Sequence, residues 1–330
     1  KLGNGTLLLV ANNSGFMGDA YVNGGTLELG DTGAAGTGVI HAVDPTIAFA
    51  AGGTYANNVS LDVASPASAD PTVFENTSGN VVTLSGAITT GTGNNINGDA
   101  IAANQHVTFS GGAFALTNAG NNWTGDTTIT SDAALALSGG ASIAHSARLV
   151  DNGIFDISAA TSESSVASLA GSGVVTLGDN TLTITNANDS FAGAIAGAGG
   201  LVLQAGTQTL AGINSYTGGT LVNGGTLALA GNGTLGDASG SATINADGTL
   251  DLGGTTQTQN GGVTLAGGAI ENGTLSSSGT FALQGGTVNA TLAGTGGVQQ
   301  SSGTTTLSGT NSSEERRVGK ECSSRWSPDH

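Results

Sequence analysis

The chain has 330 residues, of which 58 are glycine and only 4% are aromatic, so it lacks the large side chains of an ordinary mixed core. Its 38% of hydrophobic residues still provides apolar surface to bury, which predicts a folded chain built on Val, Ile, Leu and Ala. The net charge is −17, and Lys1 and Arg148 are the only Lys or Arg residues before position 313, which argues strongly against binding to nucleic acid phosphates or to anionic membranes.

The cysteine content and the hydropathy of the sequence exclude further kinds of site and segment. The single cysteine, Cys322, lies close to the C-terminus, so residues 1–312 offer no disulfide, no thiolate metal site and no cysteine nucleophile. The N-terminus shows no signal-peptide pattern, and no stretch reaches the ~20 apolar residues that a spanning helix needs. We therefore predict no transmembrane helix.

A repeated segment organises the chain from its first residues onward. FMGDAYVNGGTLEL aligns without a gap, at an offset of 200 positions, with YTGGTLVNGGTLAL. In each copy an aromatic residue has Asn or Ser one or two residues before it and Gly two residues after it. The copies lie near residues 8–30, 116–138, 182–205 and 207–231, the third of these being partial. The positions that we assign to the structural repeat are Phe16, Gly18, Trp123, Gly125, Phe191, Gly193, Tyr216, Gly218, Asn223 and Gly225.

Short alternating runs separate these copies and predict β-strands. Thr226–Leu229, Thr249–Leu252 and Thr280–Leu283 alternate apolar with polar residues and are bounded by Gly-Gly, Asn-Gly or Asp-Gly pairs, which are typical of turns. Leu and Val are expected to point inward, and Thr, Ser and Asn outward. No segment sustains a helical period.

Two all-β architectures fit such strands. A sandwich or an up-and-down barrel would need bulkier residues to fill a wide core. A parallel β-helix, or β-solenoid, needs only a narrow core of small residues, and this composition favours it. Three strands of ~5 residues plus turns give about 20 to 25 residues per coil, or roughly 13 to 15 coils over the body of the chain.

No pattern of catalytic or metal-binding residues emerges from the sequence. His41, His106 and His145 each stand apart from a second histidine or a pair of carboxylates, and we interpret them as satisfied or exposed side chains. The acidic residues around Asp62 and Asp70 are spread out, as in a solvated loop. No cofactor is predicted: Gly93–Ile101 is one imperfect copy of a calcium-binding nonapeptide that works in tandem, so calcium stays without support.

The repeat pattern stops within a unit near the C-terminus. Thr306–Ser312 corresponds to Thr209–Ser215, but Ser313 stands where an aromatic residue is due. Residues 313–330 contain four of the six basic residues, the cysteine and the second tryptophan. We therefore predict a β-helical fragment over 1–312, followed by a non-native or disordered tail over 313–330.

The segment Thr209–Leu227 closely resembles the autotransporter-associated β-strand repeat of Gram-negative autotransporter passenger domains. Asn214-Ser215-Tyr216-Thr217-Gly218-Gly219-Thr220 followed by Val222-Asn223-Gly224-Gly225-Thr226-Leu227 carries the resemblance. It implies a right-handed β-helical passenger at the cell surface or outside the cell. It also implies that the partner is a C-terminal outer-membrane β-barrel, which this chain does not contain.

The function that the resemblance implies is structural rather than enzymatic. The chain would form a surface-exposed stalk, adhesive toward ligands on host or neighbouring cells, whose coils help secretion and folding to proceed one after another. The alternatives are a β-helical polysaccharide lyase or hydrolase, a separately secreted β-solenoid adhesin and, last, a proteolytic passenger. A polysaccharide-active enzyme would need clustered Asp with nearby basic residues, and only Lys1 and Arg148 are available before residue 313.

Overall fold

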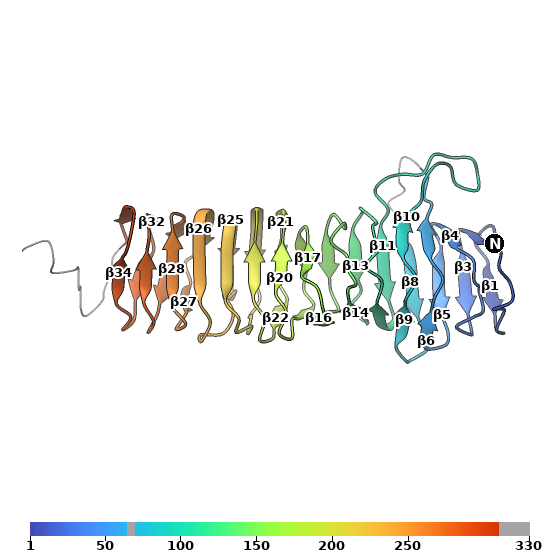
Figure 1. The fold of residues 1–330 in the computed structure, drawn as a ribbon, viewed down its shortest axis with the longest axis horizontal. Coiled ribbons are helices and arrows are strands. Elements are labelled where there is room, and N and C mark those ends of the chain that lie inside the picture. The colour runs from blue at the N-terminus through green and yellow to red at the C-terminus, as the bar shows by residue number, and fades with distance from the viewer. Residues whose placement is uncertain (65–69, 310–330) are drawn as a thin grey trace, which may run out of the picture.

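The computed structural model describes residues 1–64 and 70–309, which form a long rod with the N-terminus at one end (Figure 1). Within these residues the chain has 35 strands and no helix. Every pairing between named strands is parallel and joins one coil to the next, and the stack has about 15 coils. The predicted parallel β-solenoid is confirmed. The predicted tail, 313–330, lies outside the described residues.

The strands fall on three faces of the rod. The first face contains β2 (Ala20–Asn23), β4 (Ile40–Val43), β7 (Val59–Leu61), β10 (Ile88–Thr90), β17 (Ser164–Val166), β20 (Leu182–Ile184), β23 (Leu201–Leu203), β28 (Val263–Ala266), β31 (Phe281–Leu283) and β34 (Val298–Gln300). The second face contains β1 (Thr6–Leu9), β3 (Thr26–Leu29), β5 (Thr46–Phe49), β8 (Thr72–Asn76), β11 (Val107–Ser110), β13 (Thr127–Ile129), β15 (Leu149–Asp151), β18 (Leu169–Gly171), β21 (Ala187–Phe191), β24 (Gly206–Leu210), β29 (Ala269–Glu271), β32 (Gly286–Val288) and β35 (Thr305–Leu307).

The third face contains β6 (Gly53–Tyr55), β9 (Val82–Leu84), β12 (Gly112–Leu116), β14 (Ala133–Gly139), β16 (Ile154–Ala160), β19 (Val174–Thr176), β22 (Ala194–Ala196), β27 (Thr256–Thr258), β30 (Thr274–Ser276) and β33 (Thr291–Ala293). Two long strands, β25 (Thr220–Leu229) and β26 (Ala242–Asp251), run through both the first and the second face. They join the two faces into one sheet.

Toward the C-terminal end the coils are shorter than the sequence predicts. In the middle of the rod Thr127 pairs with Leu149 of the next coil, whereas near the end Phe281 already pairs with Val298. The prediction for coil length assumed three strands of ~5 residues each, but most strands of the structure have only three or four. Glycine-rich turns need few residues, so a coil can be short and still contain its strands.

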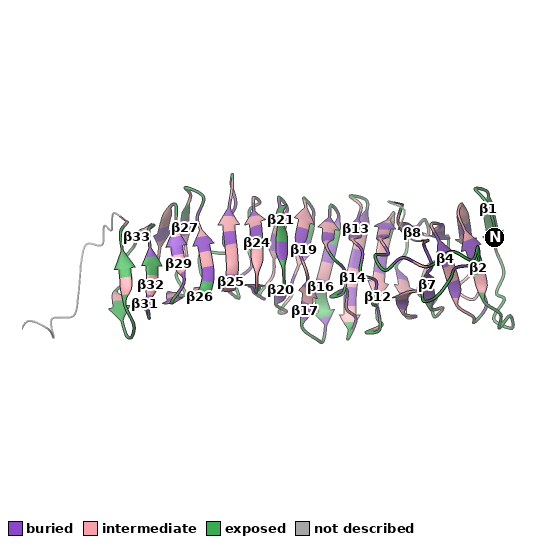
Figure 2. Cartoon of the chain, turned by 90° about the horizontal axis from the view of Figure 1, so that it is seen from above, coloured by how far each residue is buried: buried purple, intermediate pink, exposed green. Residues whose placement is uncertain are grey.

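The core follows the predicted alternation along the rod, except in the end strands β1, β34 and β35, which have no buried residue. Val107 and Phe109 are buried while Thr108 between them is half-buried, and Figure 2 shows the same alternation on strand after strand. Toward the N-terminal end aromatic rings stack through the core: the ring centroids of Phe49 and Phe74 are 6.3 Å apart, and those of Phe74 and Phe109 are 5.4 Å apart. Aliphatic residues fill most of the remaining coils.

One long loop leaves the rod between β10 and β11 and projects from its side, in teal in Figure 1. At its base the buried Gln105 side chain bonds to both the N–H and the C=O of Val63. At its tip Asn97 Oδ1 accepts a hydrogen bond of 2.9 Å from Asn23, so the loop folds back toward β2. Gly93–Ile101, the segment that resembles one copy of a calcium-binding repeat, lies in this loop. Its Asn95 Oδ1 accepts hydrogen bonds from the N–H groups of Asn97 and Asp99.

Candidate functional site

A buried aromatic corner marks the repeat in two of its copies. Trp123 and Tyr216 are 1% and 0% exposed. The indole Nε1 of Trp123 donates to Thr127 Oγ1 at 2.9 Å, and the hydroxyl of Tyr216 lies 2.7 Å from Thr220 Oγ1. In both copies the partner is the threonine four residues further on, and burial raises the pKa of the Tyr216 hydroxyl. Each buried ring therefore has a hydrogen-bond partner in the core for its polar group.

An asparagine two residues before the ring ties three coils together. Asn214 Oδ1 accepts from the N–H of Ile195 in the preceding coil at 2.9 Å, and Asn214 Nδ2 donates to the C=O of Thr234 in the next coil at 2.7 Å. Asn121 makes the same bridge, to Ile88 and Ser142. These asparagines are absent from the positions that we predicted, although the Asn-x-aromatic spacing was visible in the sequence. Their role depends on contacts between coils, which no local pattern displays.

The glycine two residues after the ring lets neighbouring coils touch. Gly125 N donates to Gln105 O at 3.1 Å, and a Cβ on Gly125 would lie 2.4 Å from that oxygen. Gly218 N donates to Gly199 O at 2.9 Å, and a Cβ there would lie 2.5 Å from the Gly199 carbonyl carbon. Backbone atoms of the preceding coil fill the space that any larger side chain would need, so these two positions require glycine.

The first copy keeps the backbone of this corner but leaves its ring outside. Phe16 O accepts from Thr37 N at 2.8 Å, just as Tyr216 O accepts from Asp237 N at 2.9 Å. The ring of Phe16 is nevertheless 54% exposed, because no described coil lies on its other side. Gly18 consequently faces only that ring, which lies 3.0 Å from the position of an added Cβ.

The partial copy near 182–205 lies at a different place in its coil. Phe191 is fully buried, but it pairs in register with Leu210 and so precedes the position of Tyr216. Gly193 packs against Gly173, whose carbonyl oxygen would lie 2.0 Å from an added Cβ. The residues are part of the core and of a tight coil contact, without the ring-and-asparagine corner.

The remaining two repeat positions lie further along β25. Asn223 faces outward in a ladder of amides: its Nδ2 donates to Gln204 Oε1 at 3.1 Å, and its Oδ1 accepts from Asn245 at 2.7 Å. Gly225 has a φ of 75°, and a Cβ on it would lie 2.1 Å from the carbonyl oxygen of Gly206. The ladder links the outer surfaces of neighbouring coils.

One polar cluster lies on the first face, and the sequence did not predict it. His41 Nδ1 lies 2.7 Å from Asp62 Oδ2, and His41 Nε2 lies 3.7 Å from Asp19 Oδ2. Tyr21 stacks on the imidazole with ring centroids 4.6 Å apart and an interplanar angle of 8°. Our prediction that no pair of carboxylates lies near His41 is wrong, because the parallel register of β2, β4 and β7 brings positions 19, 41 and 62 side by side.

The cluster does not have the geometry of a nucleophilic triad. Ser60 Oγ donates to Asp62 Oδ1 at 2.6 Å, so the serine proton goes to the carboxylate that also bonds His41. Asp62 is buried, which corrects its predicted place in a solvated loop. Of the other histidines, His106 accepts from Asp126 N at 3.0 Å and His145 is exposed, as predicted.

Arg148 forms two further ion pairs, away from the His41 cluster. Arg148 lies 2.7 Å from Asp126 and 3.5 Å from Asp189, and the hydrogen bond to Asp126 raises the pKa of the guanidinium. Among residues 1–64 and 70–309, no group of three His, Asp, Glu or Cys side chains is placed to hold a metal ion. None of the described segments forms a helix long and apolar enough to cross a membrane.

Comparison with protein families gives one match. The family model described as the passenger-associated-transport-repeat matches residues 1–29 and 202–229. Both matches end at the same position of the aligned repeat, Leu29 and Leu229, and they contain the Phe16 and Tyr216 corners. No curated protein and no solved structure matches the chain significantly.

Proposed function

Because the repeat and the β-solenoid together fit a fragment of an autotransporter passenger domain, we propose that this chain is the stalk of such a passenger. It acts at the cell surface or outside the cell, and a C-terminal outer-membrane β-barrel is its partner in export. Its role is structural and adhesive rather than enzymatic.

The three-coil bridge of Asn214 carries this proposal. In a stacked array each coil is stabilised mainly by its neighbours, so folding can proceed from a coil that is already formed. Asn214 takes one hydrogen bond from the preceding coil and gives one to the next. A coil that emerges from the membrane would therefore find a template on one side and offer one on the other, and this ordered folding would draw the chain outward.

A row of threonines supports the adhesive part of the proposal. Along the second face, residues from successive coils stand in register and point outward, namely Asn188, Thr207, Thr226, Thr249, Ala269, Thr287 and Thr306. The threonine hydroxyls in this row make no hydrogen bond to the described residues, so they are available to a ligand. Binding would be spread over many coils, and no single residue would be essential.

The secretion role is tested by exporting the chain. The chain is placed between a signal sequence and an outer-membrane barrel in a Gram-negative host, and its surface exposure is measured with protease on intact cells. We expect the double variant Asn121→Ala/Asn214→Ala to reach the surface more slowly, because both bridges are lost. Asn188→Ala, which removes an exposed amide, is the matched control. Equal export of the two variants would contradict the proposal.

The His41 cluster is the one observation that favours a polysaccharide-active enzyme. Two carboxylates flank the imidazole, and Tyr21 offers a ring on which a sugar could stack. If this alternative holds, Asp19→Asn abolishes the release of reducing sugar from a polysaccharide, whereas Asp156→Asn on the third face does not. A stalk without enzymatic activity releases no sugar with either variant or with the unmodified chain.

A further inference from the structure

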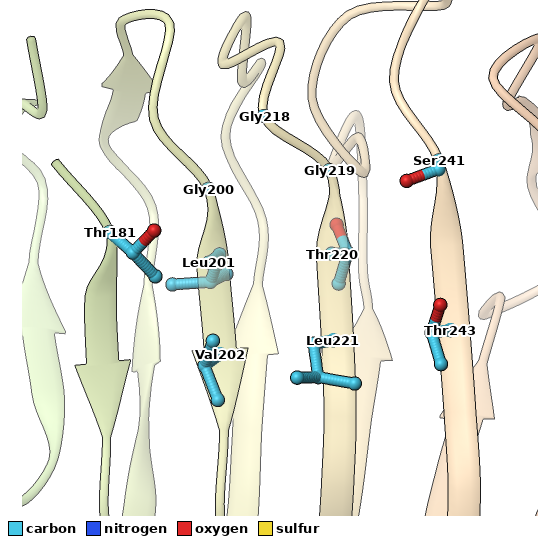
Figure 3. A pocket seen from close by; sticks show the side chains of 10 residues that line it. All are labelled: Thr181, Gly200, Leu201, Val202, Gly218, Gly219, Thr220, Leu221, Ser241 and Thr243. Carbon is cyan, nitrogen blue, oxygen red and sulfur yellow. The ribbon is translucent and has the colours of Figure 1, made fainter. Parts of the chain in front are cut away.

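A shallow groove of about 270 Å³ crosses the first face over β20, β23, β25 and β26 (Figure 3). It runs from coil to coil, across the strands rather than along them. Glycines lie where neighbouring coils meet at its rim: a Cβ on Gly219 would lie 2.7 Å from Ser241 Oγ, and a Cβ on Gly200 would lie 2.9 Å from Gly219 O. Three lining residues, Gly200, Gly218 and Gly219, thus carry no side chain where the coils meet.

The lining combines aliphatic surface with unused hydroxyl groups. Val202 and Leu221 are half-buried and face outward into the groove. Around them lie the hydroxyls of Thr181, Ser241 and Thr243, which make no hydrogen bond to the described residues (Figure 3). A hydroxyl both donates and accepts, so this rim suits a ligand that also carries groups of both kinds.

The groove is electrically neutral in a strongly acidic protein. None of its lining residues is charged, and residues 190–236 contain no Asp, Glu, Lys or Arg, although the chain has a net charge of −17. A cationic ligand would find no carboxylate here, and an anionic ligand would find no basic group. The charge of this surface is therefore complementary only to an uncharged ligand.

The same place in the first repeat carries different chemistry. At the offset of 200 positions, Gly219 corresponds to Asp19 and Leu221 corresponds to Tyr21. There, Tyr21 stacks on His41, and Asp19 lies beside the imidazole. Asp19 and Tyr21 make the surface of the first repeat acidic and aromatic, whereas Gly219 and Leu221 leave the later one uncharged and aliphatic. The neutral groove belongs to the copy near 207–231, and the His41 cluster belongs to the copy near 8–30.

We propose that this groove binds a neutral saccharide chain lying along the axis of the rod. The aliphatic side chains of Val202 and Leu221 would contact the C–H faces of the sugars, and the three hydroxyls would exchange hydrogen bonds with sugar hydroxyls. The lining residues come from four coils, so the groove would accept a section of a longer chain. The inference rests on the adhesive part of the proposed function, and it adds to the dispersed row of the second face one localised site on the first face, with its class of ligand.

The test measures binding of neutral hexasaccharides to the purified full chain by saturation-transfer NMR and calorimetry. The panel contains cellohexaose, maltohexaose and chitohexaose, with an oligogalacturonate as the anionic comparison and an uncharged extended peptide as the competing class. Leu221→Glu places a charge in the groove, and Ser241→Ala and Thr243→Val each remove a hydroxyl. Thr264→Glu and Thr264→Val, on the neighbouring strand β28 but outside the groove, are the matched controls.

We expect at least one neutral hexasaccharide to bind. Leu221→Glu should abolish that binding, and each hydroxyl deletion should weaken it about threefold to tenfold. The Thr264 variants should bind like the unmodified chain. Binding of the peptide alone, binding that survives Leu221→Glu, or no saccharide binding at all would each overturn the inference. Because this assay involves no export, such a result would leave the export measurement, and with it the stalk function, unaffected.

Discussion

Replacing the buried Asp151 should change how the stability of the rod depends on pH. Asp151 ends β15 with its side chain in the core, in register with Ile129 before it and Gly171 after it. Its Oδ1 accepts one hydrogen bond, from Gly153 N at 3.1 Å, while its Oδ2 is buried without a partner among the described residues. Burial raises the pKa of the carboxyl from 3.8 to about 7.

The sign of the effect follows from the direction of this pKa shift. Below pH 3.8 the carboxyl is protonated in both the folded and the unfolded chain, and its burial carries no charge penalty. Between pH 3.8 and about 7 the unfolded chain loses the proton first, so the free energy of unfolding falls as the pH rises. Above pH 7 the whole contribution is lost, which amounts to about 4 kcal/mol for a displacement of this size.

The assay compares Asp151→Asn with the unmodified chain at pH 4.5 and pH 8. The amide keeps the acceptor for Gly153 and carries no charge, so we expect similar stability at pH 4.5 and a more stable variant at pH 8. Hydrogen exchange of the β15 and β18 amides is the suitable measurement, because a stacked array need not unfold in a single step. Asp156→Asn, on the third face of the same coil, controls for net charge. An equal difference between Asp151→Asn and the unmodified chain at both pH values would refute the reasoning.

Three further substitutions test the corner and the ion pairs. Tyr216→Phe should cost only about 1 kcal/mol in local stability, since Thr220 Oγ1 keeps a second contact at Leu235 O, and hydrogen exchange of the β25 amides checks this value. Gly125→Val should separate two coils, because a Cβ there meets Gln105 O at 2.4 Å, and limited proteolysis should reveal a new cleavage site near residue 125. Arg148→Gln should change stability by less than about 1 kcal/mol, because its ion pairs are partly exposed, and urea titration at low and high salt measures the effect.

The sequence predicted the fold because inward and outward positions alternate in nearly every strand. Thr226–Leu229 is strand as expected, and Leu227 and Leu229 point into the core. The alternation indicates whether each side chain is buried or points outward, and glycine-rich turns indicate where each coil bends. Coil length was predicted less well, because the residues of a strand do not indicate how short that strand and its turns can be.

Contacts between coils were beyond the reach of sequence reasoning. Asp19, His41 and Asp62 belong to three successive coils, so no short motif unites them, yet the parallel register brings their side chains within hydrogen-bonding or ion-pair range. The groove was hidden for the opposite reason. Its lining includes glycines that appear in the sequence as ordinary turn residues, and only the stacked coils show that they lie side by side.

The aromatic corner shows how the repeat couples two positions through one hydrogen bond. Trp123 and Tyr216 each have a polar hydrogen in the core, and each has threonine four residues later. Phe16 has no such hydrogen, and Ala20 stands at the corresponding place. A buried donor without a partner costs about 1 to 3 kcal/mol, so a ring with an N–H or O–H is stable here only beside a hydroxyl. The residue at the ring therefore limits the residue four positions later, whereas outward positions such as 21 and 221 are under no such limit and differ freely between copies.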